Sequence, residues 1–296
     1  MSIDGPEPTA DTIFEIGSIT KVFTAFLLAD MVERGEVALS DPVRKYLPAS
    51  VMVPSRRGRD ISLVDLATHT SGLPRDSVTV DLQSDNNPYV GYAPSDLYAF
   101  LGSYRLERDP GSRWEYSNVG MGLLGHVLAL RAGVSYEDLL RRRIFEPLGM
   151  ANTTITVDVE PRSRRATGYN SRLLPVPPWT GGVVAAAGGV NSTSADMSKF
   201  AADVIDAQSP RKAVFARMTS VKRPSEESRV QQALGWNVFR LGSNEILAHS
   251  GGTFGFQSRL IVDITRRRAA IAWLNGVGGG GVSDLVGLAL DRAGLQ

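Results

Sequence analysis

Apolar side chains follow Ser18 at helical spacing and predict the first long helix of the chain. Between Ser18 and Arg34 they recur at intervals of three and four residues, as Val22, Phe23, Phe26, Leu27 and Met31. Gly35 directly follows this run and supplies a C-terminal stop, because glycine readily adopts the left-handed conformation that ends many helices. Ser18 is therefore expected to begin or cap this helix.

Helical patterns continue from about residue 36 to residue 210. Capping-box-like segments or single serines mark the helix starts, at Ser62–Asp65, Ser95, Ser135–Asp138 and Ser194. Residues 118–131 are almost wholly apolar, which indicates a buried helix. This part of the chain is therefore predicted to be mostly helical.

After residue 210 the pattern changes to that of strands separated by turns. The segments that predict strands are 235–240, 245–249, 256–262 and 269–275. Turns are expected at 241–244 and 263–266, and a last helix over 283–293 would cover one face of the sheet.

Helices followed by strands of this kind place the chain in the α+β class, as an antiparallel sheet flanked by helices and joined to a helical region. Residues 1–296 are expected to form a single domain. Its α/β part would come from 1–35 and 211–296, and its mostly helical part from 36–210.

Composition narrows the range of partners. With 296 residues, of which 43% are hydrophobic, the chain can bury a large core. Its 32 Lys and Arg side chains nearly balance 31 Asp and Glu, and the short arginine runs are scattered, which argues against nucleic acid as a partner. No apolar run approaches the roughly 18 residues of a membrane-spanning helix. The absence of cysteine excludes disulfides and thiol nucleophiles.

Ser18-Ile-Thr-Lys21 is the first candidate for chemistry. A serine hydroxyl is a poor nucleophile until a neighbouring base takes its proton. Residues three apart lie on one face of a helix, so Lys21 would hold its amine near the Ser18 hydroxyl. The backbone N–H of Ser18 would lie among the unpaired donors of the helix start, where an oxyanion could bind.

This motif alone is equally typical of an N-cap serine beside a surface lysine. The chain contains a second match, Ser209-Pro-Arg-Lys212, in a polar stretch that has no apolar helix to bury the lysine. The second match is interpreted as a loop. The apolar residues after Lys21 distinguish the first match, because a dry environment lowers the pKa of a lysine.

Tyr116 and Asn118 stand where the apolar helix over 118–131 begins. A tyrosine hydroxyl can relay protons, and an asparagine amide can donate a hydrogen bond to a substrate carbonyl. The structural alternative makes Tyr116 a core aromatic residue and Asn118 a helix cap.

His249-Ser-Gly-Gly252 ends one of the predicted strands. The two glycines would let a substrate approach the strand edge, and the Gly252 N–H would be a second oxyanion donor. Taken alone, His249 is more typical of a hydrogen-bonded structural histidine. A nucleophile elbow centred on Ser250 is rejected, because residue 248 is alanine, the next segment is a strand, and all three histidines precede Ser250. No metal-ligand spacing occurs, so no metal or cofactor is expected.

The motifs Ser-x-x-Lys, Tyr-Ser-Asn and His-Ser-Gly occur in that order and together carry a resemblance. The chain resembles the superfamily of class C β-lactamases, D-Ala-D-Ala carboxypeptidases and β-lactamase-like esterases. Similar segments are spread along nearly the whole chain, at 12–24, 65–74, 147–150 and 187–193. The resemblance implies a β-lactamase and transpeptidase type of fold.

The resemblance also implies roles for the site residues. Ser18 would be acylated, while Lys21 and Tyr116 would handle the protons, with either one as the main base. Asn118 would bind the substrate amide, and the backbone N–H groups of Ser18 and Gly252 would hold the oxyanion. The substrate would be a β-lactam, a D-amino-acid peptide or a small ester.

One departure from the family pattern concerns the strand motif, which is His249-Ser250-Gly rather than Lys-Thr-Gly. His249 and Ser250 would still help to bind substrate, but a neutral histidine attracts a β-lactam carboxylate less than a lysine does. Esterase or peptidase activity is therefore expected ahead of efficient β-lactam turnover. A carboxylesterase, an acyltransferase and a non-catalytic penicillin-binding or regulatory protein remain as alternatives.

The other departure is that only 17 residues precede Ser18, whereas family members usually carry a helix and two strands there. Either the chain is truncated or its sheet lacks those strands, and a homodimer would then cover the exposed edge. The chain as written has no signal peptide, which fits a cytoplasmic location, while a truncated leader would fit a periplasmic or secreted one.

Overall fold

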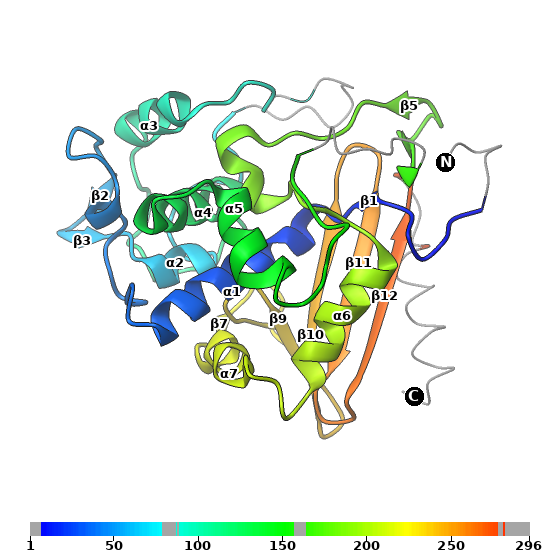
Figure 1. Cartoon of the computed structure of the whole chain (residues 1–296). Helices are drawn as coiled ribbons and strands as arrows, with labels where there is room; N and C mark the ends of the chain where they lie inside the picture. The colour runs from blue at the N-terminus through cyan, green and yellow to red at the C-terminus, as the bar shows by residue number, and fades with distance from the viewer. Residues whose placement is uncertain (1–6, 79–86, 88, 157–163, 278–280, 282–296) are drawn as a thin grey trace.

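The computed structural model describes residues 7–78, 87, 89–156, 164–277 and 281. A six-stranded antiparallel sheet stands beside a helical region, as Figure 1 shows. The order of strands across the sheet is β12-β11-β10-β9-β8-β7. The α+β class expected from the sequence is confirmed.

The long strands of the sheet match the four predicted strands to within a few residues. The six strands are β7 (Arg223–Pro224), β8 (Gln231–Gln232), β9 (Asn237–Leu241), β10 (Asn244–Gly252), β11 (Gln257–Asp263) and β12 (Arg268–Leu274). The sequence does not predict β7 and β8, because a strand of two residues shows no alternation.

Three two-stranded sheets lie outside this sheet. They pair β1 (Phe14–Glu15) with β6 (Asn191–Ser192), β2 (Ser55–Arg56) with β3 (Arg59–Asp60), and β4 (Gly168–Tyr169) with β5 (Pro175–Val176). The N-terminal strand β1 therefore does not extend the six-stranded sheet. Among the described residues β12 and β7 form the two edges of that sheet. The homodimer over an exposed edge stays a prediction.

Most of the remaining described elements are helical, as the sequence predicts. The helices are α1 (Thr20–Glu33), α2 (Leu63–Ala67), α3 (Pro94–Ser103), α4 (Asn118–Ala132), α5 (Tyr136–Leu140), α6 (Ser194–Ile205) and α7 (Lys212–Ser220), with shorter helical turns η1 (Gly17–Ile19), η2 (Val43–Tyr46), η3 (Arg141–Phe145) and η5 (Gly182–Ala187). The helix predicted over 283–293 lies outside the described residues.

The predicted helix starts are confirmed with small shifts. Ser62 forms a capping box with Asp65 at α2, and the Ser135 hydroxyl accepts a hydrogen bond from a backbone N–H at α5. Helix α3 begins at Pro94 rather than after Ser95, because proline suits the first helical turn. Helix α6 is capped by Thr193 rather than begun after Ser194, because Thr193 is the residue in extended conformation.

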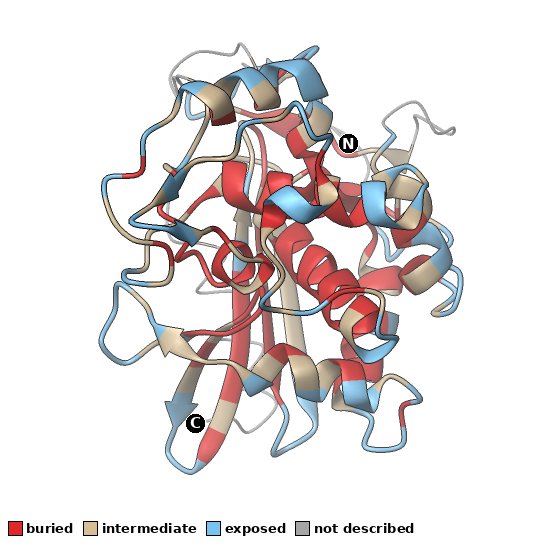
Figure 2. Ribbon diagram, turned by 90° about the vertical axis from the view of Figure 1, so that its left-hand side faces the viewer, coloured by how far each residue is buried: buried red, intermediate tan, exposed pale blue. Residues whose placement is uncertain are grey.

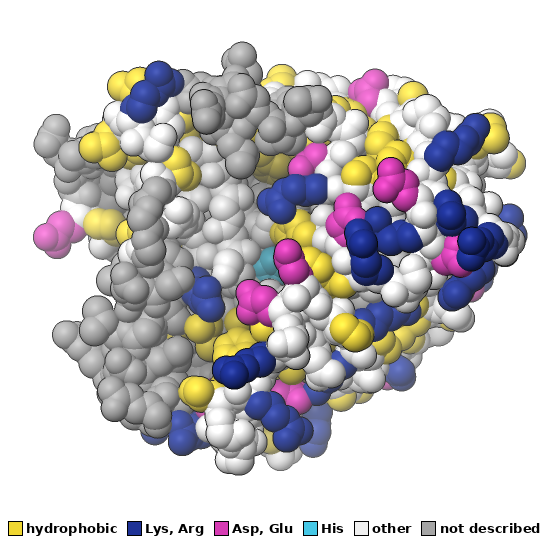
Figure 3. All heavy atoms as spheres, turned by 180° about the vertical axis from the view of Figure 1, so that it is seen from behind, with side chains coloured by type: hydrophobic (Ala, Val, Ile, Leu, Met, Phe, Trp, Pro, Cys, Tyr) yellow, Lys and Arg dark blue, Asp and Glu magenta, His cyan; other side chains and the backbone are white. Residues whose placement is uncertain are grey.

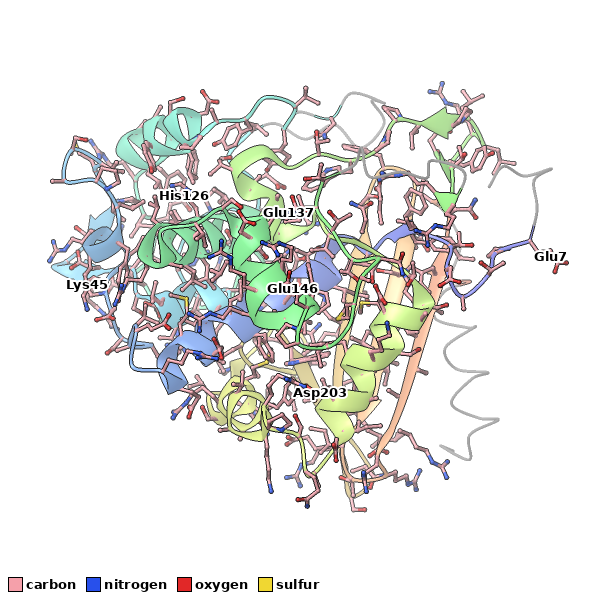
Figure 4. The ribbon with its side chains drawn as sticks, viewed as in Figure 1. Glu7, Lys45, His126, Glu137, Glu146 and Asp203 are labelled. Atoms are coloured by element: carbon pink, nitrogen blue, oxygen red, sulfur yellow. The ribbon has the colours of Figure 1, made fainter. Side chains whose placement is uncertain are left out.

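The second Ser-x-x-Lys match ends in a helix that the sequence does not predict. Residues 209–211 form a loop, as expected, but Lys212 is the first residue of α7. The loop is held by an ion pair of 2.6 Å between Arg211 and Asp203, which lies near the end of α6 and is labelled in Figure 4. Lys212 itself is exposed, so it lacks the dry environment that a catalytic amine needs.

Helix α1 runs through the centre of the core. Every residue from Thr20 to Met31 is buried, which is expected of a helix that is apolar on all sides. Its aromatic side chains pack edge-on against three other elements. Phe23 lies 4.7 Å from Phe200 of α6 and 5.5 Å from Phe145 of η3, and Phe26 lies 5.5 Å from Phe215 of α7. Figure 2 shows the buried helices and the sheet in contact across this core. The turn that carries Ser18, at the start of α1, is therefore held in place by the packing of this helix.

Candidate active site

The turn that carries Ser18 is held tightly between α1 and the end of β10. Gly17 has φ of +50°, a conformation that favours glycine, and a Cβ at this position would lie 2.6 Å from the backbone nitrogen of Gly252. Gly251 approaches the turn still more closely, because its Cβ would lie 2.0 Å from the carbonyl oxygen of Ile16. The Ser258 hydroxyl donates to that same carbonyl at 2.8 Å. These glycines place Ser18 beside the Gly252 backbone.

Four of the residues singled out in the sequence form one hydrogen-bonded cluster. The Lys21 amine lies 3.0 Å from the Ser18 hydroxyl oxygen and donates to the Asn118 side-chain oxygen at 2.8 Å. The Tyr116 hydroxyl donates to the Ser18 oxygen at 2.8 Å. The turn η1 supplies Ser18 and helix α1 supplies Lys21, while Asn118 begins α4 and Tyr116 lies two residues before it. Segments about 100 residues apart therefore meet at one hydroxyl.

Burial separates the proton affinities of the two candidate bases. Lys21 is fully buried, which lowers the pKa of its amine well below 10.5, and the nearby Arg75 charge lowers it further while Asp76 opposes the shift. Desolvation raises the pKa of the Tyr116 phenol to about 12. At neutral pH the phenol therefore keeps its proton, and the amine is the group that more easily loses one.

The hydrogen bonds of Lys21 orient its lone pair. Besides Asn118, the amine donates to the carbonyl oxygen of Ala187 in η5 at 2.6 Å. A neutral amine has two N–H groups, and these two acceptors use both. In its neutral form, the amine would therefore direct its lone pair at the third neighbour, the Ser18 hydroxyl. In this arrangement the neutral Lys21 amine can accept the proton of Ser18 without movement of any heavy atom.

A cavity of about 290 Å³ opens over Ser18. Its wall includes Asn118 and Gly252 on the side of the nucleophile, and it extends to polar and aromatic residues, namely Arg75, Asp76, Tyr89, Trp179, Thr253 and Phe254. Tyr116 lies at the border between this cavity and a neighbouring groove, because it bonds to Ser18 and also lines that groove.

His249 and Ser250 line the neighbouring groove rather than the cavity over Ser18. The His249 ring is buried and its Nδ1 contacts the Ser250 carbonyl oxygen at 2.8 Å. Burial lowers the pKa of His249 to about 4, and the charge of Lys21 contributes. The ring is thus neutral at neutral pH. The face of the molecule in Figure 3 is hollowed, and a histidine side chain is visible inside the hollow.

The sequence analysis missed Asp76, which holds two members of the site. Its Oδ1 accepts hydrogen bonds from the Tyr89 hydroxyl at 2.8 Å and from the Asn118 amide nitrogen at 3.0 Å. No periodic pattern joins these positions, since Asp76 and Tyr89 lie in irregular segments. The only signal is that Asp76 lies two residues after the family-like segment 65–74.

His69 is a second residue that the sequence analysis missed. It has φ of +56°, and its Nδ1 accepts a hydrogen bond from the Ser117 N–H at 3.1 Å. Its ring lies 4.5 Å from the Tyr116 ring, so it supports the phenol from behind. Its Nε2 is buried without a hydrogen-bond partner among the described residues.

Within the described ranges, no three His, Asp or Glu side chains gather in a way that would bind a metal ion. In the same part of the chain, no single helix is long and apolar enough to cross a membrane, and one bent pair, α4 with residues 136–145, passes by length and composition alone.

Comparisons with known proteins agree with this geometry. The family model named Beta-lactamase matches residues 3–292. The chain is 30% identical over 272 residues to the D-alanyl-D-alanine-carboxypeptidase/endopeptidase AmpH of Escherichia coli, with 84% of this chain and 67% of that protein covered. It is 28% identical to an Escherichia coli beta-lactamase, with 92% of this chain and 71% of that protein covered.

Solved structures show the same fold. The beta-lactamase/D-alanine carboxypeptidase of Yersinia pestis superposes with a TM-score of 0.84 at 26% identity, over 98% of this chain and 87% of the other. A class C beta lactamase of Rhodobacter sphaeroides superposes with a TM-score of 0.81 at 25% identity, over 100% of this chain and 89% of the other. The chain therefore belongs to the beta-lactamase family and is a serine hydrolase of that family.

Proposed function

We propose that the chain forms an acyl-enzyme on Ser18 and cleaves amide or ester bonds in small esters, D-amino-acid peptides or β-lactams. The observation that carries this proposal is the buried Lys21 amine, which lies 3.0 Å from the Ser18 hydroxyl and is held by the oxygens of Asn118 and Ala187, so that its neutral form would direct a lone pair at Ser18. The Escherichia coli relative is named a D-alanyl-D-alanine carboxypeptidase, and other relatives are named beta-lactamases, which supports these substrate classes.

In the acylation step, the Ser18 proton moves to Lys21 while the serine oxygen attacks the substrate carbonyl carbon. The backbone N–H groups of Ser18 and Gly252 would stabilise the oxyanion. When the tetrahedral intermediate collapses, the bond to the leaving nitrogen or oxygen breaks, and Tyr116 delivers a proton to that atom. The Lys21 ammonium then gives a proton back to the phenolate, so that both groups regain their starting forms before deacylation.

Hydrolysis of the acyl-enzyme reverses the roles. Water attacks the acyl carbon, its proton passes to the Tyr116 and Lys21 pair, and the Ser18 oxygen leaves with a proton. An alcohol or amine in place of water would give acyl transfer. The neutral His249 supplies no positive charge to a β-lactam carboxylate, so ester and peptide substrates are favoured over rapid β-lactam turnover.

Intact-mass measurement after incubation with a p-nitrophenyl ester, nitrocefin and a fluorescent penicillin tests the proposal. We expect a covalent adduct on Ser18 and its loss in Ser18→Ala. Stable labelling by penicillin without turnover of any compound would instead favour the non-catalytic penicillin-binding alternative. The absence of any adduct with serine-reactive probes would contradict the proposal.

The chain also offers a matched pair of lysine variants. Lys21→Met should lower the acylation rate by about 10²- to 10⁴-fold, the usual contribution of a positioned base. Lys212→Met removes the lysine of the second Ser-x-x-Lys match, which is exposed, and should leave the acylation rate unchanged.

A further inference from the structure

The cavity over Ser18 has a carboxylate in its wall that the acylation chemistry does not use. Asp76 lines this cavity together with Ser18 and Asn118, and its side chain is only 11% exposed. The two hydrogen bonds that it receives, from Tyr89 and Asn118, both end on Oδ1 and both come from neutral donors. They orient the carboxylate without neutralising it.

The nearest cation pairs weakly with Asp76. Arg75 Nε lies 3.6 Å from Asp76 Oδ2, beyond ordinary hydrogen-bond length, and the Arg75 side chain is 69% exposed. Its guanidinium lies 5.0 Å from the centre of the Tyr116 ring. Because the guanidinium is exposed and lies beyond hydrogen-bond length, water screens its attraction for the carboxylate.

Aromatic rings line the same cavity as the carboxylate. Tyr89, Trp179 and Phe254 line it, and the Tyr89 and Trp179 rings meet edge to face at 6.2 Å. The faces of aromatic rings attract cations, and such rings beside a carboxylate are the usual surroundings of a bound ammonium group. Neither an anionic nor a purely apolar group would satisfy both features.

The direction of the cavity indicates which part of a substrate reaches Asp76. Asn118, expected to bind the substrate amide on the acyl side, donates directly to Asp76. His249 and Ser250 line the groove that lies on the other side of Tyr116. The acyl part of the substrate therefore extends toward Asp76, and the leaving group toward the strand motif.

From these contacts we propose that the cavity over Ser18 selects substrates whose acyl group carries an ammonium group, held between Asp76 and the aromatic wall. This inference rests on the proposed acyl-enzyme chemistry and names its substrate class. No step of the reaction changes the charge of this ammonium group, so its recognition contributes only to binding.

Two esters that differ only in charge test the proposal. One is the p-nitrophenyl ester of trimethylammonio-butanoate, and the other is its isostere with a tert-butyl group in place of the trimethylammonium. After correction for their rates of hydrolysis without enzyme, we expect kcat/KM to favour the cationic ester by about tenfold or more. A p-nitrophenyl sulfobutanoate supplies the anionic comparison and should be the poorest substrate.

Variants connect that preference to the wall of the cavity. Asp76→Asn keeps an oxygen that accepts the two hydrogen bonds but loses the charge, and it should lower the ratio of cationic to neutral kcat/KM by about tenfold. Trp179→Leu should lower the same ratio if Asp76→Asn does not fold. Glu226→Gln removes an exposed carboxylate from the opposite side of Tyr116 and should leave the ratio unchanged.

Equal rates for the cationic and neutral esters, or a preference for the sulfonate, would overturn the inference while leaving the proposed hydrolase intact. If no ester is cleaved, the affinity for butyltrimethylammonium, measured by titration calorimetry, tests the inference instead. Its affinity should exceed that of butanesulfonate and should fall about tenfold in Asp76→Asn. Equal affinities of the two ions would overturn the inference independently of catalysis.

Discussion

At the scale of single residues, Lys21 has an environment that a structural lysine does not need. A buried amine is costly unless it is hydrogen-bonded, and here two neutral oxygens and a serine hydroxyl surround it without a direct carboxylate partner. A carboxylate in contact would have kept the amine charged. The surroundings of Lys21 therefore favour the neutral form, which is the form that can act as a base.

The lowered pKa of Lys21 predicts the pH dependence of acylation. Below that pKa the amine carries a proton and has no lone pair, so kcat/KM for a neutral ester should fall about tenfold for each pH unit. Above that pKa the rate should level off, until the Tyr116 phenol loses its proton near pH 12. Stopped-flow measurement of acylation between pH 5 and pH 9 checks the acidic limb.

His126→Gln serves as a control for this profile. His126 is a histidine of α4 that bonds to the Tyr98 hydroxyl at 2.7 Å, away from Ser18, and it is labelled in Figure 4. Its replacement should leave the acidic limb in place. A rate that stays constant as the pH falls would contradict the role of Lys21 as base.

The sequence could predict Ser18, Lys21, Tyr116 and Asn118 because each pair lies close together along the chain. One helical turn joins the first two, and one helix start joins the others. Asp76 could not be predicted in the same way. It reaches Asn118 across 42 positions through an irregular segment, and no spacing rule connects such positions.

At the scale of elements, the site depends on how closely the nucleophile turn and β10 approach each other. Gly251 and Gly252 carry no side chain that would keep the two backbones apart. The sequence analysis assigned these glycines to substrate approach. The structure shows that Gly251 instead admits the carbonyl of Ile16 from within the protein.

Gly251→Ala should therefore both destabilise the protein and slow acylation. Its Cβ would lie 2.0 Å from the Ile16 carbonyl oxygen and 2.3 Å from the Ser258 hydroxyl, so the backbone must move. Overpacking of this kind costs about 1–3 kcal/mol of unfolding free energy. Urea denaturation and the acylation rate measure the two effects.

Gly276→Ala is the matched control for this substitution. No atom lies within 4 Å of a Cβ built at Gly276, and its backbone is not in the left-handed region. An equal loss of stability in both variants would show that close approach is not the reason for Gly251.

The elements that the sequence could predict are those long enough to show a period. Strands β9 to β12 are each at least five residues long, and α1 and α4 extend for several turns. The two-residue strands β7 and β8 have no such pattern, and their pairing depends on the neighbouring strand β9. Helix α7 follows a proline and charged residues, which locally favour a turn over a helix.

At the scale of the whole molecule, one core joins the sheet and the helical region. The same cluster of buried residues includes Phe23 of α1, Leu124 of α4, Trp236 before β9 and Leu260 of β11. Buried histidines contact this core, and their protonation connects its stability to pH. His249 is only 4% exposed, and its pKa is lowered from 6.5 to about 4.

This shift predicts a loss of stability in acid. Between pH 6.5 and pH 4 the unfolded chain binds a proton at His249 and the folded chain does not, so the unfolding free energy falls as the pH falls. The full contribution is present above pH 6.5 and amounts to about 3 kcal/mol. The buried His69 acts in the same direction, because its pKa is also lowered.

Chemical denaturation at pH 7 and pH 4 checks this prediction when the protein is compared with His249→Gln. The variant should lose less stability between the two pH values, since its side chain does not titrate. If both proteins lose the same unfolding free energy between pH 7 and pH 4, His249 is not protonated on unfolding.

The acceptor that aligns Lys21 from η5 is a main-chain oxygen, the carbonyl of Ala187. Replacing the Ala187 side chain does not remove that oxygen, so the alignment of the amine depends on where the backbone of η5 lies. Displacement of the local backbone, in contrast, moves the oxygen away from the amine. Insertions or deletions in η5 should abolish turnover even when every reacting side chain is intact, and a survey limited to polar side chains would miss this vulnerable segment.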